Sequence, residues 1–233
     1  MHEPSEITLK DVADELQRGN RVAMLVRHAE RPPLPANDPT FGRDLPLTRQ
    51  GAADATRYGR ELGQLTGRDQ MVVSAGGNRR CMETAFHMLA GMGLDMDDER
   101  YAVLADPYLG GRTCYFGDVA ERMALANAGN YMESLNAYFR DGRQKGFNEL
   151  HVSTSILSGH LLYHCDVPLF IGITHDLNLA CFLAGNGAVA SFTEETWPRF
   201  LDAAVLFIQP DYTATCHLLR SLTINYPPHV SKP

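Results

Sequence analysis

Short apolar runs alternate along the chain with stretches in which apolar residues recur at helical spacing. The runs predict strands at 22–26, 71–73, 101–105 and 169–173, and a hairpin of strands at 203–208 and 213–219. The helical spacing predicts helices over 8–18, from Thr48 through Leu65, and over 80–92 and 177–183. Strands that alternate with helices are typical of α/β proteins, so we expect α/β architecture.

One long stretch lacks strand signals. Residues 118–165 show mostly helical spacing, and a glycine-containing loop precedes them at 107–117. At 233 residues the chain is long enough to bury a sizeable core. We therefore expect a single domain over 1–233, with a small, mainly helical insertion at about 107–165.

Three of the predicted strands are followed by residues that can hold and attack phosphate. Arg27 and His28 follow the first, Arg80 comes soon after the second, and His175 and Asp176 follow the fourth. In open α/β sheets, ligands bind outside the carboxyl ends of the strands, so we expect these residues to converge. Guanidinium groups match phosphate oxygens with a rigid fork of donors, and a neutral imidazole can act as a nucleophile. The pattern predicts a site that binds a phosphate group and attacks it.

Charge, cysteines and hydropathy narrow the class of protein. The formal net charge is -7, which argues against a nucleic-acid-binding protein. The five cysteines are widely spaced and form no CxxC motif, so we expect free thiols in a reducing compartment. The first residues lack the pattern of a signal peptide, and no apolar run is long enough to span a bilayer. We expect a cytoplasmic protein without a membrane partner.

The chain resembles the histidine phosphatase superfamily, which includes acid phosphatases and phosphoglycerate mutases. Four segments carry the resemblance, in the family's order. Arg27-His28-Ala29-Glu30-Arg31-Pro32 is similar to the RHGxRxP motif, Asp44-Leu45-Pro46-Leu47-Thr48 with Gly51 to DxPLTxxG, Arg80-Cys81-Met82-Glu83-Thr84-Ala85 to RAxxTA, and Thr174-His175-Asp176 to the second histidine motif. The His-Asp form of the last motif is typical of the acid phosphatase branch. Ala29, in place of the usual glycine, is the clearest departure.

The resemblance implies a fold and a set of roles. The fold is a three-layer sandwich with a mostly parallel central sheet. The activity is hydrolysis of phosphomonoesters through a phosphohistidine, without a metal or another cofactor. The implied roles are nucleophile for His28, phosphate binding for Arg27, Arg31, Arg80 and His175, and general acid for Asp176.

Several alternatives stay open at this point. Asp106, in the segment Leu104-Ala105-Asp106 before Gly110, loosely resembles the position of the acid in the mutase branch, and a turn residue is its other interpretation. Arg79 competes with Arg80, and the frame of the family's motif, counted back from Thr84 and Ala85, favours Arg80. A mutase-type isomerase and a phospholigand-binding protein without activity are the alternative functions.

Substrate and metal are less defined by the sequence. We expect a small phosphomonoester as substrate, with a phosphoprotein as the alternative; the pattern makes no prediction of oligomeric state. His160 and His164 have the i, i+4 spacing of metal ligands on a helix, but no third ligand is evident. We therefore expect these two histidines to lie on a packed or solvated helix face.

Overall fold

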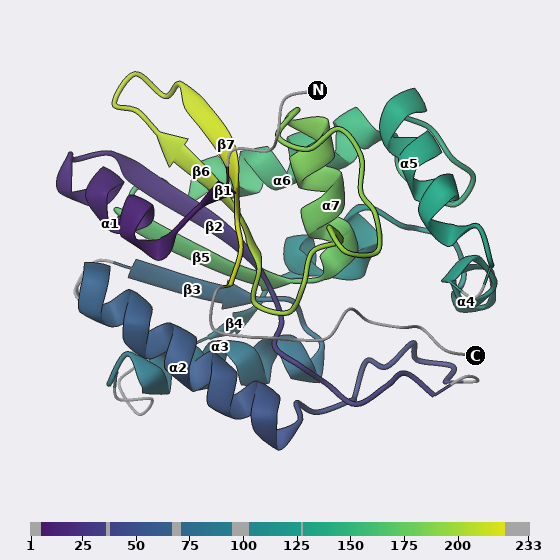
Figure 1. Cartoon of the computed structure of the whole chain (residues 1–233), viewed down its shortest axis with the longest axis horizontal. Helices are drawn as coiled ribbons and strands as arrows, with labels where there is room; N and C mark the ends of the chain where they lie inside the picture. The colour runs from purple at the N-terminus through teal and green to yellow at the C-terminus, as the bar shows by residue number, and fades with distance from the viewer. Residues whose placement is uncertain (1–5, 36–37, 67–70, 95–102, 127, 222–233) are drawn as a thin grey trace.

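In the part of the chain that the structure describes, one mixed sheet of seven strands organises the fold (Figure 1). The computed structural model describes residues 6–35, 38–66, 71–94, 103–126 and 128–221. The elements in chain order are β1 Glu6–Ile7, α1 Leu9–Gln17, β2 Arg21–Arg27, α2 Arg49–Thr66, β3 Met71–Ala75, α3 Arg79–Gly91, β4 Leu104–Ala105, the 3₁₀ turns η2 Pro107–Leu109 and η3 Gly111–Thr113, α4 Val119–Ala126, α5 Tyr131–Asp141, α6 Leu150–Tyr163, β5 Leu169–Thr174, α7 Asp176–Gly185, β6 Ala203–Ile208 and β7 Ala214–Leu219.

The strand order is β1-β7-β6-β2-β5-β3-β4. Strand β6 runs antiparallel to both of its neighbours, β2 and β7, and every other neighbouring pair of these strands is parallel. The expected α/β fold with a mostly parallel sheet is confirmed.

Helices cover both faces of the sheet and form the outer layers of the sandwich (Figure 1). On one face, Tyr58 of α2 and Met88 of α3 belong to the same buried cluster as Met24 of β2. On the other face, Leu161 of α6 belongs to a cluster with Leu25 of β2. Successive β2 residues thus contact opposite layers, which explains why this strand is a continuous apolar run rather than an alternating one.

Helices α2 and α3 approach closely enough for their backbones to touch. A Cβ atom added to Gly59 would lie 2.0 Å from the carbonyl oxygen of Met88, and one added to Gly91 would lie 2.0 Å from that of Thr56. Only glycine leaves room for such an approach. The two glycines therefore determine how closely α2 and α3 pack.

The structure differs from the sequence-based expectation mainly at short elements. Strand β1 was not expected, because two residues carry no periodic signal, and β7 begins at Ala214 rather than Thr213. Of the strand expected at 101–105, β4 is observed at Leu104–Ala105, and residues 101–102 lie outside the described residues.

The stretch expected as an insertion, 107–165, holds η2, η3 and helices α4 to α6. Its last helix, α6, also contributes Leu157 and Leu161 to the layer that covers the sheet. The domain organisation stays a prediction. Among the described helices, none combines the length and the apolar character needed to cross a bilayer.

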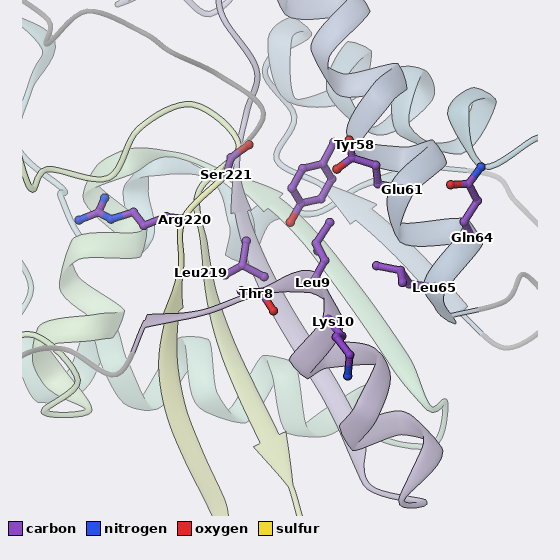
Figure 2. Close-up of a pocket in the computed structure, with 10 residues that line it drawn as sticks. All are labelled: Thr8, Leu9, Lys10, Tyr58, Glu61, Gln64, Leu65, Leu219, Arg220 and Ser221. Atoms are coloured by element: carbon purple, nitrogen blue, oxygen red, sulfur yellow. The ribbon is translucent and has the colours of Figure 1, made fainter.

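Helix α1 begins with a capping box, in which the Asp11 carboxylate accepts a hydrogen bond from the Thr8 amide at 2.7 Å. Beside it, α1, α2 and the end of β7 enclose a pocket of about 370 Å³ (Figure 2). Its lining includes Lys10, Tyr58 and Arg220, but none of the predicted site residues. The phosphate site expected from the sequence is therefore not this pocket.

Candidate functional site

The three predicted segments meet at the carboxyl ends of β2, β5 and β3. The sheet register places Arg27 opposite Thr174 and Ala75 opposite Ile173, so the strands end at the same level. Parallel neighbours in the order β2-β5-β3 bring segments that are far apart in sequence to one edge of the sheet.

Hydrogen bonds beyond the strands tie these segments together. The His28 amide donates to the Thr174 carbonyl at 2.9 Å, and the Gly76 amide donates to the Ile173 carbonyl at 2.9 Å. The Ala29 amide donates to Oγ1 of Thr84 on α3 at 3.0 Å. Each segment is thus bonded to the other two, so the relative positions of their side chains are fixed by backbone contacts.

The imidazole of His28 is held in one orientation and one tautomer. Its Nδ1 lies 2.7 Å from the carbonyl oxygen of Ala29, which can only accept, so Nδ1 carries the proton. Nε2 therefore has the free electron pair, and it accepts a hydrogen bond from Nε of Arg80 at 3.1 Å. The residue is only 3% exposed. Burial, followed by the charges of Arg80, His175 and Arg27, holds the pKa of His28 well below its usual value, which keeps the ring neutral.

Arg80 also lies beside His175. A terminal nitrogen of the Arg80 guanidinium is 3.4 Å from Nδ1 of His175, and the side-chain amide nitrogen of Asn78 is 3.3 Å from Nε2. Both neighbours are donors, and a neutral imidazole accepts at only one of its nitrogens. In either tautomer of His175, therefore, only one ring nitrogen accepts a hydrogen bond from its neighbour. The other ring nitrogen carries the proton.

Arg27 and Asp176 form an ion pair at the edge of the cluster. Their closest nitrogen and oxygen atoms are 2.9 Å apart. Arg27 also donates to the Pro198 carbonyl at 2.6 Å, and its guanidinium carbon lies 4.3 Å from the centre of the Phe200 ring. Burial alone would raise the pKa of Asp176, but the charge of Arg27, assisted by His175, outweighs it and lowers that pKa.

Arg31 completes the set of guanidiniums. One terminal nitrogen donates to the Pro32 carbonyl at 2.7 Å, while Nε is buried and has no hydrogen-bond partner among the residues that the structure describes. Burial and the neighbouring charges of Arg80 and Arg27 lower the pKa of Arg31 to about 10, although Asp176 opposes the shift. Arg31 still carries its charge at neutral pH. Arg27, Arg31 and Arg80 interact electrostatically with one another, and Asp176 offsets only one of their charges, so an excess of positive charge remains that favours an anion.

The second motif segment supports the loop that carries Arg31. Thr48 donates through its hydroxyl to the Glu30 carboxylate at 2.6 Å, and its amide donates to the Glu30 carbonyl at 3.0 Å. A Cβ atom on Gly51 would lie 2.3 Å from that carbonyl oxygen, which explains a glycine at this position. Ala29 is fully buried and is not among the described residues with positive φ, so its methyl group causes no backbone strain.

The rival residues lie in other surroundings. The Asp106 carboxylate contacts the amide of Tyr108 at 2.9 Å and Nε2 of His160 at 2.7 Å, not the guanidiniums. Arg79 points to the exposed side of α3, where it pairs with Glu83 at 2.6 Å. Cys81, beside Arg80, is fully buried, and burial raises the pKa of its thiol to about 12, so the thiol stays protonated at neutral pH.

Sequence reasoning missed the residues that frame Arg27 and His175. Pro198 and Phe200 lie in the loop between α7 and β6, which has no periodic pattern to single them out. Asn78 follows β3 within a glycine-containing turn and gave no signal beyond its residue type. Its position as N-cap of α3, two residues before Arg80, is the feature that could have identified it.

Comparisons with known proteins agree with this geometry at the level of the fold. No family model and no curated protein sequence matches the chain. Among solved structures, it is similar to an alpha-ribazole phosphatase from Shigella flexneri, with 18% identity, a TM-score of 0.51, and coverage of 86% of this chain and 96% of that chain.

Two further solved structures show the same likeness. A mycobacterial glucosyl-3-phosphoglycerate phosphatase has 15% identity and a TM-score of 0.53, with 86% of this chain and 98% of that chain covered. A phosphoglycerate mutase from Bacillus anthracis has 14% identity and a TM-score of 0.54, with 87% and 94% covered. Two of these neighbours are phosphatases and one is a mutase, and they are members of the histidine phosphatase superfamily. The resemblance seen in the four sequence motifs is thus matched in three dimensions, and the chain has the phosphoglycerate mutase-like fold of that superfamily.

Proposed function

We propose that the protein is a phosphatase that hydrolyses phosphomonoesters through a phosphohistidine on Nε2 of His28. The observation that carries the proposal is the state of this imidazole. Its Nδ1 proton is fixed by the Ala29 carbonyl, its ring is neutral, and Arg80 is bonded to the nitrogen that would attack. A neutral nitrogen with a free electron pair is what a nucleophilic histidine requires.

In the first step, Nε2 attacks phosphorus in line and forms the P–N bond, while the ester P–O bond breaks. Arg27, Arg31 and Arg80 hold the equatorial oxygens, where charge is spread in the transition state. His175 donates another hydrogen bond to the phosphoryl group. In the second step, water attacks the phosphohistidine and inorganic phosphate leaves.

Asp176 protonates the leaving oxygen in this scheme. Without substrate its carboxyl is ionised and paired with Arg27. A bound phosphomonoester carries about -1.5 to -2 charge. It competes for Arg27 and adds negative charge beside the carboxylate, and both effects raise the pKa of Asp176 toward a protonated state. Asp106 is less suited to this role, because its carboxylate contacts His160 and the Tyr108 amide.

Small phosphomonoesters are the substrate class that we propose, with phosphoproteins as the alternative; no metal is required. The names of the structural neighbours describe enzymes that act on small phosphorylated molecules. One of them is a mutase, so transfer between two positions of the same molecule is the competing activity.

Turnover of an aryl phosphate in excess chelator tests the proposal. We expect activity in the wild type, its loss in His28→Ala with the folded spectrum unchanged, and its retention in His151→Ala, since His151 is exposed on α6. Rapid quenching followed by mass spectrometry should find phosphate on His28. Full activity in His28→Ala would refute the mechanism. Interconversion of phosphoglycerates without phosphate release would favour the mutase instead.

A further inference from the structure

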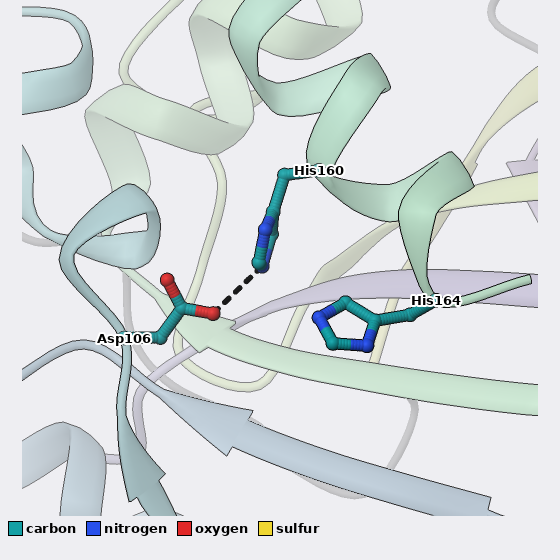
Figure 3. Close-up of side chains that lie close together, drawn as sticks. All are labelled: Asp106, His160 and His164. Atoms are coloured by element: carbon teal, nitrogen blue, oxygen red, sulfur yellow. Dashed lines mark ion pairs between the residues drawn. The ribbon is translucent and has the colours of Figure 1, made fainter.

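Three potential metal ligands meet outside the phosphate site (Figure 3). Asp106 follows β4, and His160 and His164 come from the last turn of α6 and its C-cap. One ligand atom from each residue can be chosen so that all lie within 4.8 Å of one another. The third ligand that the sequence did not reveal is thus supplied by a turn far from α6 in the chain.

The nitrogen of His160 that faces the cluster is not satisfied by hydrogen bonding. Its side chain is only 9% exposed, and Nε2 lies 2.7 Å from Oδ2 of Asp106. Among the described residues this nitrogen forms no hydrogen bond of good geometry, so its contact with the carboxylate is an ion-pair distance rather than a well-formed hydrogen bond. A buried polar atom left in this state costs free energy, and a cation between the two groups would satisfy both.

Neighbouring groups fix all three side chains in place. The ring of His164 is parallel to that of Phe170, with the ring centres 4.3 Å apart, and Tyr108 stacks on His160 at 5.2 Å. The other carboxylate oxygen of Asp106, Oδ1, accepts from the Tyr108 amide, which leaves Oδ2 directed at the histidines. Ligands that are held before the ion arrives lose little conformational entropy when it binds.

We propose that Asp106, His160 and His164 bind one divalent transition-metal ion, with Zn²⁺ as the best match. Imidazole nitrogens with a carboxylate suit Zn²⁺ and its neighbours in the first transition row, whereas Mg²⁺ and Ca²⁺ prefer oxygen ligands. Metal–ligand bonds of about 2.0–2.2 Å place tetrahedral ligand atoms roughly 3.4 Å apart. The observed spacing needs only small side-chain movements to reach this geometry.

The same three residues line a pocket of about 640 Å³, which also borders Tyr163 and Ser155. The pocket leaves space for water or an exogenous ligand at the open coordination position, as in sites with three protein ligands. A bound ion would also join the end of β4 to α6. It would therefore stabilise the folded state, which alone holds the three ligands together.

Metal binding is measured on the full chain. Metals are first removed with a chelator, and the protein is then exchanged into metal-free buffer. We expect calorimetry with Zn²⁺ to give one high-affinity ion per chain, and Co²⁺ to give the visible absorption bands of a four- or five-coordinate site. Zn²⁺ should also raise the melting temperature. All three signals are expected to disappear in Asp106→Asn and His164→Gln.

The variants and their control are chosen to separate ligation from folding. Asp106→Asn keeps an oxygen that accepts from the Tyr108 amide but removes the anionic ligand. His151→Gln changes an exposed histidine on the same helix and should leave all three signals as in the wild type. Melting curves in chelator show whether each variant folds.

Two results would overturn the proposal. One is a wild type that binds no stoichiometric ion under these conditions. The other is a folded Asp106→Asn or His164→Gln that retains the Co²⁺ spectrum, because the ion would then lie at another of the nine histidines.

Discussion

Nε of Arg80 donates a hydrogen bond to Nε2 of His28, so the guanidinium covers the single ring nitrogen that has a free electron pair. Another nitrogen of the same guanidinium approaches His175. One rigid, planar group therefore lies against both imidazoles. In the proposed reaction the N–H groups of Arg80 must donate to the phosphate oxygens instead of to the His28 ring. The planar guanidinium has several N–H groups, so Arg80 can do this while it stays between the two histidines.

Replacing this fork by an ammonium tests the role of Arg80. Lysine keeps the charge but cannot direct several N–H groups in one plane, so we expect Arg80→Lys to lower kcat by roughly 10²–10³-fold, as for the loss of one transition-state donor. Arg79→Lys is the matched control, because Arg79 pairs with Glu83 on the surface. Steady-state kinetics with an aryl phosphate decides. A larger loss of kcat in Arg79→Lys than in Arg80→Lys would assign the phosphate-binding role to Arg79.

The protonation of His28 gives a second prediction. Because burial and three neighbouring cationic or imidazole groups lower its pKa, the ring should stay neutral, with the proton on Nδ1, as the pH falls through 6.5. Nitrogen chemical shifts of labelled histidine, assigned with His28→Gln, measure this directly. A ring that becomes protonated at its usual pKa would contradict the proposed electrostatics of the site.

The lowered pKa of His28 also makes the free energy of unfolding depend on pH. In the unfolded chain His28 binds a proton at about pH 6.5, whereas the folded chain resists it, so below that pH the unfolded state binds more protons. The contribution of His28 to the free energy of unfolding should therefore decrease as the pH falls below about 6.5. Denaturation measured as the pH is lowered should show a smaller decrease in the free energy of unfolding for His28→Gln than for the wild type.

The identity of the general acid predicts a dependence on the leaving group. Asp176→Asn should reduce hydrolysis of alkyl phosphates by roughly 10²–10⁴-fold, because an alkoxide needs a proton as it leaves. Aryl phosphates, whose leaving groups are stable anions, should be affected far less. The ratio of kcat/KM for the two ester types is the measurement. If Asp106→Asn changes this ratio and Asp176→Asn does not, the acid is Asp106.

The contact between α2 and α3 predicts a large effect from a single methyl group. Gly59→Ala forces a Cβ atom against the Met88 carbonyl, and we expect it to lower the free energy of unfolding by at least ~1–3 kcal/mol. Gly159→Ala, in α6, has open space around the added atom and should instead stabilise the protein by about 0.5–1 kcal/mol. Urea denaturation compares the two. Equal changes in the free energy of unfolding would show that helix propensity, and not the close approach of α2 and α3, determines the effect of Gly59→Ala.

The parts of the fold that could be predicted are those in which burial leaves a long pattern. Strands β2 and β5 are buried on both faces, and their runs of apolar residues ended close to the observed boundaries. Because such strands end at one edge, Arg27, His28 and His175 could be expected together from their positions alone. The two-residue strand β1 is too short to show a period, and its pairing with β7 depends on tertiary contacts.

Other features of the site depend on contacts that no local pattern encodes. The i, i+4 spacing of His160 and His164 predicts that they share a helix face, but not that Asp106 lies against it. The orientation of Arg27 depends on the Pro198 carbonyl and on Phe200, both in a loop without periodicity. Such partners come from the path of the chain, which single-sequence patterns describe only where the backbone is regular.

Strand β2 has β5 and β6 as its neighbours, and both come from the last third of the chain. During synthesis, the segment that carries His28 is therefore made long before either neighbour leaves the ribosome. It cannot pair with its neighbouring strands until residues 169–208 are available, so the sheet edge that carries the candidate site should be among the last parts of the protein to assemble. A nascent or truncated chain that ends before β5 would carry the proposed nucleophile on an unpaired, apolar strand, and would be prone to aggregation rather than partially active.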